Sequence, residues 1–255
     1  TDSPAAASHR ARNTRRSRLA CIGRRNPRST AACSAEGLWP AVIQPGTSMP
    51  PHPSQPNPDL LSRFPLPARA VVEIGCGTGA LAAAHRAVTP RVRWYGVDSD
   101  PAAIEEAARW MDGAACLDIE TDPLPFDLPE GIDCLIYGDA LQRLRDPSAV
   151  LRRHVAQLQD EGMLLICVPN LEHWSFAERL LRGTWAYEPA GLLDRTHLRW
   201  FTLDTLRQDL LEMGLSICDV HPRIFAPEAA QRFTAAIAPA LAALGVDQER
   251  YLQRA

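Results

Sequence analysis

The chain has 255 residues, a hydrophobic fraction of 46%, a charged fraction of 22% and a formal net charge of −3 at pH 7. This composition is typical of a globular protein with a sizeable core, and no apolar run approaches the roughly 18 residues of a membrane span. Residues 1–48 contain eight Arg and two acidic residues, whereas the other 19 Arg and 28 acidic residues make the remainder acidic. An acidic body repels phosphates, so nucleic acid is not an expected partner.

The cysteines argue against a disulfide framework. The chain has seven Cys, an odd number, and none of them forms a CxxC pair. Several lie in apolar runs, where a free Cys behaves as a small hydrophobic residue. This usage favours the reducing cytoplasm.

Residues 1–58 are expected to precede the folded part as a disordered, basic and Pro-rich leader. Residues 1–48 show neither helical nor strand periodicity and contain few apolar residues to offset the entropy of ordering. Their composition is similar to that of a transit peptide or a basic arm, and the alternative is upstream sequence with Met49 as the natural start. Residues 49–58 are rich in Pro and are expected to be extended.

From about residue 59, segments with strand and helix character alternate. Near-continuous apolar runs predict strands at 70–74, 93–97, 114–117, 134–137, 163–168 and 215–220. The segments between them predict helices at 79–88, 101–111, 147–158 and 203–213, and two begin with Asp-Pro, a helix-start signal. This alternation predicts an α/β fold with a doubly wound, mostly parallel sheet.

Two further segments complete the expected organisation. Residues 171–200 are irregular and rich in aromatic residues, and they follow a strand, so they are expected at the carboxyl edge of the sheet. Such an insertion is either a lid over a substrate or a flap that only covers the sheet. We therefore expect one cofactor-binding domain over 59–222 with an aromatic insertion at 171–200, followed by a C-terminal helical extension at 223–255.

The segment Glu73-Ile74-Gly75-Cys76-Gly77-Thr78-Gly79 joins the first strand of this domain to a helix. Its glycines allow conformations and close ligand approach that other residues forbid, which is typical of a nucleotide-cofactor site. One interpretation is a nicotinamide dinucleotide site of the G-x-G-x-x-G/A kind. However, Glu73 would repel a pyrophosphate, whereas an acid suits a cationic amino acid moiety.

The pattern E-x-G-x-G-x-G resembles motif I of the class I S-adenosylmethionine-dependent methyltransferases. Similar blocks follow: Tyr95 to Asp100 resembles the second family strand, 117–119 the end of the third, and 137–140 the end of the fourth. The resemblance, over about residues 60–220, implies that Asp98 binds the ribose hydroxyls and that Asp118 meets the adenine amine. The cofactor-binding residues it implies are Glu73, Gly75, Cys76, Gly77, Thr78, Gly79, Asp98, Ser99, Asp118, Ile119, Tyr137 and Gly138.

Residues 191–202 resemble a signature of bacterial methyltransferases tied to sugar or glycosyl-transfer pathways. The resemblance implies in-line methyl transfer from S-adenosylmethionine (SAM) to a small molecule or a sugar-bearing intermediate. His197 is the candidate general base because imidazole titrates near neutral pH, and Asp194 is the candidate group that orients it. Asp139 is a candidate for binding the substrate or the cofactor ammonium; the structural alternatives are a cap for Asp139 and a backbone contact for His197. No spacing of His, Cys, Asp or Glu predicts a metal site.

Three departures from the family pattern keep alternatives open. Gln142 and Arg143 stand where the family commonly has an acid and a His. No final antiparallel strand is evident after 215–220, so either the last strand is missing or 223–226 serves poorly in its place. The C-terminal helices would then cover the sheet edge or contact a partner chain in a homodimer. The alternative functions are an NAD(P)-binding Rossmann oxidoreductase and a catalytically inactive SAM-binding scaffold subunit.

Overall fold

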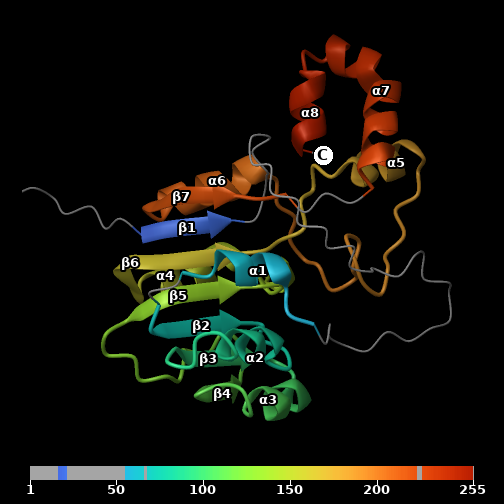
Figure 1. Ribbon diagram of the computed structural model, residues 1–255. Coiled ribbons are helices and arrows are strands. Elements are labelled where there is room, and N and C mark those ends of the chain that lie inside the picture. The colour runs from blue at the N-terminus through green and yellow to red at the C-terminus, as the bar shows by residue number, and fades with distance from the viewer. Residues whose placement is uncertain (1–16, 22–54, 66–67, 223–225, 255) are drawn as a thin grey trace, which may run out of the picture.

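The computed structural model describes residues 17–21, 55–65, 68–222 and 226–254, and Figure 1 shows how their helices and strands are arranged. Seven strands form one sheet in the order β4-β3-β2-β5-β6-β1-β7, and every pairing in it is parallel. The strands are β1 (Ser17–Cys21), β2 (Ala70–Ile74), β3 (Arg93–Asp98), β4 (Gly113–Cys116), β5 (Ile132–Tyr137), β6 (Leu158–Ile166) and β7 (Leu215–Val220).

The eight described helices are α1 (Pro58–Arg63), α2 (Ala80–Arg86), α3 (Pro101–Ala107), α4 (Pro147–Val155), α5 (Trp174–Leu181), α6 (Leu203–Glu212), α7 (Pro227–Ala243) and α8 (Gln248–Arg254), with a 3-10 turn η1 (Leu141–Arg143). Five of them, α1 to α4 and α6, pack on the two faces of this sheet. Alternate strand residues enter two separate cores, since side chains along a strand point to opposite faces. Leu135 and Leu164 pack with residues of α4 and α6, whereas Ile136 and Leu165 pack with residues of α1, α2 and α3. The predicted doubly wound α/β class is therefore confirmed.

The helix-start signals work as predicted. Asp100 and Asp146 accept hydrogen bonds from backbone amides in the first turns of α3 and α4, and Thr202 caps α6. One boundary differs: β6 begins at Leu158, five residues before the expected strand, because Leu158 already pairs with Ile132 across an irregularity in β5.

The first strand corrects the expectation that residues 1–58 precede the fold. Ser17–Cys21 form β1, which lies between β6 and β7; Leu19 is in register with Leu164 on one side and Ile217 on the other. β1 runs parallel to both neighbours, so it is not the antiparallel strand with which the sheet of the family ends. Most of the weak candidate for that strand, residues 223–225, lies outside the described residues.

The aromatic insertion is closed at its base by the sheet-like contact of Asn170 with Phe201, where the Leu171 amide donates to the Phe201 carbonyl at 2.8 Å. Figure 1 shows α5, α7 and α8 gathered beyond the carboxyl ends of the strands. Trp174 of α5 packs against Phe233 of α7 with ring centroids 6.0 Å apart. The C-terminal helices thus rest on the insertion. Among the described residues, no helix combines the length and apolarity needed to cross a membrane.

Candidate functional site

The turn between β2 and α2 requires glycine on two grounds. Gly75, Gly77 and Gly79 have φ angles of 71°, 51° and 77°, a region that side chains with a Cβ rarely adopt. A Cβ on Gly75 would also lie 2.9 Å from the Cβ of Ala140, and one on Gly79 would lie 3.1 Å from the Cα of Ala107. The turn is therefore left-handed and packed closely against neighbouring elements.

Asp98, the last residue of β3, is held beside this turn. The backbone amide of Gly77 donates to its Oδ2 at 2.9 Å, and the amide of Asp100 donates to its Oδ1 at 3.0 Å. Each carboxylate oxygen has two lone pairs, so each keeps acceptor capacity for a ligand hydroxyl. The side chain is only partly buried, and the adjacent Ser99 is exposed. This arrangement places an oriented carboxylate at the glycine turn, where the sequence predicted one.

Glu73 lies in β2, one residue before the strand ends, and only 5% of it is exposed. The indole N–H of Trp94 donates to its Oε2 at 2.9 Å. Burial raises the pKa of Glu73 to about 8; the Trp94 hydrogen bond opposes this rise and the charge of Asp98 adds to it. The carboxyl is therefore protonated at neutral pH without a ligand, and a cation nearby would favour its ionised form.

The next wall of the site comes from the segment after β4. The Leu117 amide donates to the Asp98 carbonyl at 3.1 Å, which brings the exposed Asp118 next to the end of β3. One Asp118 oxygen accepts the amide of Glu120 at 2.9 Å, so this residue also serves as a turn acid. Ile119 is half-buried and packs against the core.

Two predicted cofactor residues have their side chains in the core. Tyr137 is fully buried, and its hydroxyl is 2.5 Å from Nδ1 of His154. Cys76 is 6% exposed, and a Cβ on Gly96 would lie 2.8 Å from its Sγ. If these two residues bind the cofactor, as predicted, they do so through their backbone, because their side chains are turned into the core. Thr78 and Gly138 stay half-buried at the site edge.

The predicted catalytic residues Asp139, Asp194 and His197 lie near one another, because backbone hydrogen bonds join the insertion to η1. The amides of Leu198 and Arg199 in the insertion donate to the Gln142 carbonyl at 2.8 and 3.0 Å. His197 is therefore adjacent to η1, and the charge of Asp139 acts on it. Asp194 is 3.8 Å from the Arg143 guanidinium, so the insertion and η1 share an ion pair as well.

The surroundings of Asp194 and His197, the two predicted catalytic residues in the insertion, shift their pKa values for different reasons. Burial acts to raise the pKa of Asp194, but two hydrogen bonds from Thr196 and the charge of Arg143 outweigh it, and the pKa is lowered. Burial lowers the pKa of His197, and the charge of Asp194 opposes this only in part. At neutral pH, Asp194 is thus ionised and His197 is neutral, the state that a general base needs.

An aromatic cluster fixes the position of His197. Phe176, Trp185 and Trp200 pack together with ring centroids 5.4 to 6.2 Å apart. The His197 ring meets Trp200 edge to face at 5.7 Å. The insertion therefore has its own small core, which the sequence indicated by its aromatic content.

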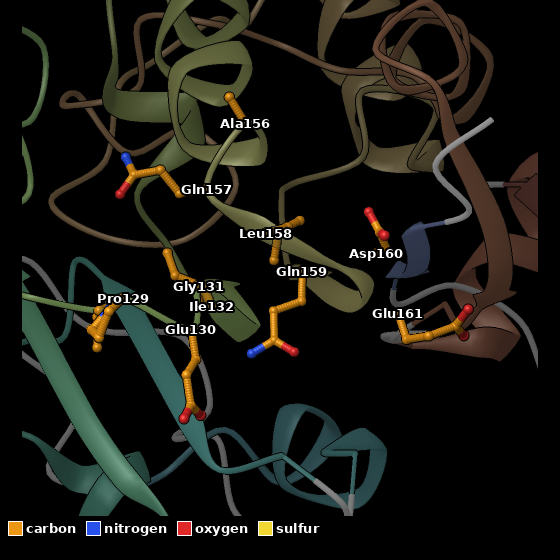
Figure 2. A pocket seen from close by; sticks show the side chains of 11 residues that line it. Pro129, Glu130, Gly131, Ile132, Ala156, Gln157, Leu158, Gln159, Asp160 and Glu161 are labelled. Atoms are coloured by element: carbon orange, nitrogen blue, oxygen red, sulfur yellow. The ribbon is translucent and has the colours of Figure 1, made fainter. Parts of the chain in front are cut away.

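A cavity lined by described residues lies away from this site. Figure 2 shows its lining side chains, from the segment before β5 and from the end of α4 and the start of β6. It measures about 650 Å³ and opens at the amino ends of these strands. Ligands of open α/β sheets bind at the carboxyl ends, so the glycine turn is the better candidate. The described residues contain no group of three or more His, Cys, Asp or Glu placed to hold a metal ion.

The parallel doubly wound sheet, the left-handed glycine turn and the carboxylate at the end of the next strand define a nucleotide-cofactor domain. The sequence from 52 to 220, more than half of the chain, matches the methyltransferase domain family. The chain therefore belongs to that family, which confirms the resemblance read from its motifs.

Individual relatives match a smaller part. The chain is 32% identical over 143 residues to trans-aconitate 2-methyltransferase of Klebsiella pneumoniae, covering 56% of this chain and 54% of that protein. It is 29% identical over 136 residues to the enzyme of that name from Escherichia coli, covering 53% and 52%. The chain thus spans about half the length of the curated relatives it matches.

Among solved structures, the plantazolicin methyltransferase BpumL, in complex with SAH, is similar with 21% identity and a TM-score of 0.45, covering 57% of this chain and 55% of that one. A putative methyltransferase from Haloferax volcanii, in complex with the Trm112 methyltransferase activator, is similar with 23% identity and a TM-score of 0.46, covering 60% and 65%.

Proposed function

We propose that the protein is a SAM-dependent methyltransferase that acts on a small molecule or a sugar-bearing intermediate by in-line transfer. The observation that carries this proposal is the Asp98 carboxylate, oriented by the Gly77 and Asp100 amides at the edge of the glycine turn. Membership of the methyltransferase domain family supports it. The relatives named for trans-aconitate make that small molecule one acceptor to test.

The residues present suit the parts of SAM. Asp98 would accept hydrogen bonds from the ribose hydroxyls, and Asp118 with Ile119 would line the adenine. Glu73 lies below the turn, where ionisation of its carboxyl would compensate a ligand ammonium. SAM supplies a methyl group already activated on a positively charged sulfur. The chain must then position the acceptor and, for a hydroxyl, remove its proton.

The group at η1 and the insertion supplies these acceptor functions. Neutral His197 would take the proton that a hydroxyl loses, and the ionised Asp194 would stabilise the imidazolium that results. Asp139, exposed at the end of β5, would contact the acceptor or the cofactor ammonium. Ala140 packs against Gly75, so this group borders the cofactor turn directly.

Calorimetric titration with SAM and with NAD tests the proposal. We expect heat from SAM and none from NAD. Binding of NAD alone would instead support the oxidoreductase alternative. Binding of SAM with no release of S-adenosylhomocysteine against any acceptor would support an inactive scaffold subunit, and binding of neither would overturn the proposal.

A further inference from the structure

Two buried polar atoms at the contact between η1 and the insertion have no hydrogen-bond partner. They are Oε1 of Gln142 and Nδ1 of His197. The Gln142 residue is 1% exposed and the His197 residue 9% exposed. Buried polar groups in native proteins are nearly always paired, so two unpaired ones on segments joined by the backbone contact of Gln142 with Leu198 point to a ligand.

The orientation of Gln142 fixes what its free atom can bind. Its Nε2 donates to the Asp139 carbonyl at 3.1 Å, so the amide is turned with Oε1 away from that bond. A carbonyl oxygen only accepts hydrogen bonds. The missing partner of Gln142 is therefore a donor, an O–H or an N–H group.

His197 adds a second acceptor. Its lowered pKa leaves the ring neutral at physiological pH, and a neutral imidazole has one nitrogen with a lone pair. The backbone of residues 198 and 199 is bonded to the Gln142 carbonyl, so the two side chains start from adjoining positions. An acceptor molecule would thus meet two lone pairs, one on each residue.

The kind of partner that these atoms need excludes a carboxylate. Asp139, Asp194 and Arg143 act on His197, and the Arg199 guanidinium lies at the Leu198 carbonyl at 3.1 Å, so charges of both signs surround the contact. A carboxylate has no proton to donate to either lone pair. A neutral or cationic group with hydrogen-bond donors does.

On these grounds, and resting on the proposed function, we infer that Gln142 and His197 select an acceptor with two adjacent hydrogen-bond donors, as in a vicinal diol or a primary amine. Gln142 accepts one donor and holds the molecule. His197 takes the proton from the other O–H or N–H while the electron pair of that atom forms the new bond to the methyl carbon. The bond from the methyl carbon to sulfur breaks, and its electron pair stays on sulfur.

The test uses full-length protein with saturating SAM and three probes: methyl glucoside for the diol, ethanolamine for the amine and trans-aconitate for the carboxylate. Binding is followed by saturation-transfer NMR, and turnover by release of S-adenosylhomocysteine. We expect one of the two donor probes to bind and be methylated, and trans-aconitate to do neither. The donor probe that is methylated faster shows whether the acceptor carries a diol or an amine.

Three variants then assign the role of Gln142. Gln142→Met keeps the length but removes the acceptor, and we expect KM for the donor probe to rise by about tenfold with little change in kcat, the size of one lost hydrogen bond. Gln142→Asn, which keeps both the amide donor and the acceptor oxygen on a shorter side chain, should retain part of the affinity. Gln157→Met, an exposed residue at the distant cavity of Figure 2, should leave KM unchanged.

The outcomes separate this inference from the proposed function. Loss of SAM binding in calorimetry would remove the proposed function itself. Three outcomes with intact SAM binding would overturn the inference alone: methylation of trans-aconitate, binding of none of the probes, or an unchanged KM in Gln142→Met. In the last case a bound water would be sufficient to satisfy Oε1.

Discussion

Asp98 is oriented before a ligand arrives, because two backbone amides hold its carboxylate. We expect Asp98→Ala to weaken SAM binding by about 1–3 kcal/mol, the range for hydrogen bonds to charged groups. Calorimetry measures this directly. Asp127→Ala, a change at an exposed loop position, is the control and should bind SAM as the wild type does. Equal affinity in Asp98→Ala would contradict the ribose role.

Glu73 predicts a pH dependence of cofactor affinity. Its pKa is about 8 in the free protein, so ionising it to meet a cation releases a proton below that pH. Affinity for SAM should therefore rise from about pH 6 to about pH 8, by at most about tenfold per pH unit. The variant Glu73→Gln, which cannot ionise, should show a flatter dependence. If both proteins share one slope, Glu73 does not face the ammonium.

At the scale of elements, the β2–α2 turn combines a left-handed backbone with a close neighbour. Gly75→Ala should destabilise the protein by more than the roughly 1–2 kcal/mol of a left-handed alanine, because its Cβ would also meet Ala140 at 2.9 Å. Gly183→Ala is a matched control: its φ of 68° is close to the 71° of Gly75, but nothing lies within 4 Å. Urea unfolding compares the two variants.

The two glycine variants should differ in unfolding free energy by the contribution of the contact alone. Equal losses would show that Ala140 moves aside without cost. SAM affinity gives a second measurement, and only Gly75→Ala should reduce it, since Gly183 lies in the insertion after α5.

The same elements show what the sequence predicts well. The glycine turn, Asp98 and the helix caps depend on neighbours within a few residues, so their motifs predicted them. The face of Tyr137 depends on the pleat of β5, and alternation places it opposite Ile136 in the core with His154. The contact between the Gln142 carbonyl and the amides of Leu198 and Arg199 joins residues more than 50 positions apart, and no local pattern signals it.

For the whole molecule, buried histidines set the response to acid. Burial lowers the pKa of His154 to about 4, against 6.5 for an exposed histidine, and His173 is lowered to about 4 as well. Between these values the unfolded state binds more protons, so stability falls as the pH falls from 6.5 towards 4. For His154, which is fully buried, the slope is at most about 1.4 kcal/mol per pH unit.

Urea unfolding at several pH values between about 7 and about 5 measures this slope. His154→Gln removes one titrating group and should flatten the dependence by up to one proton. A variant with the slope of the wild type would show that His154 binds protons equally in the folded and unfolded states, and the acid response would then belong to other groups.

The place of β1 also sets the order in which the molecule can be assembled. Residues 17–21 are translated early, yet they pair with 163–166 and with 215–220, which leave the ribosome much later. Such distant partners make folding slow, because a long loop must close before the contacts form. Removal of residues 1–48 would leave the backbone N–H and C=O groups of β6 and β7 that now pair with β1 without partners. We expect the truncated protein to melt at a lower temperature and to self-associate. Scanning calorimetry and light scattering measure these two effects. An unchanged melting temperature and a monodisperse sample would mean that β1 does not stabilise the sheet.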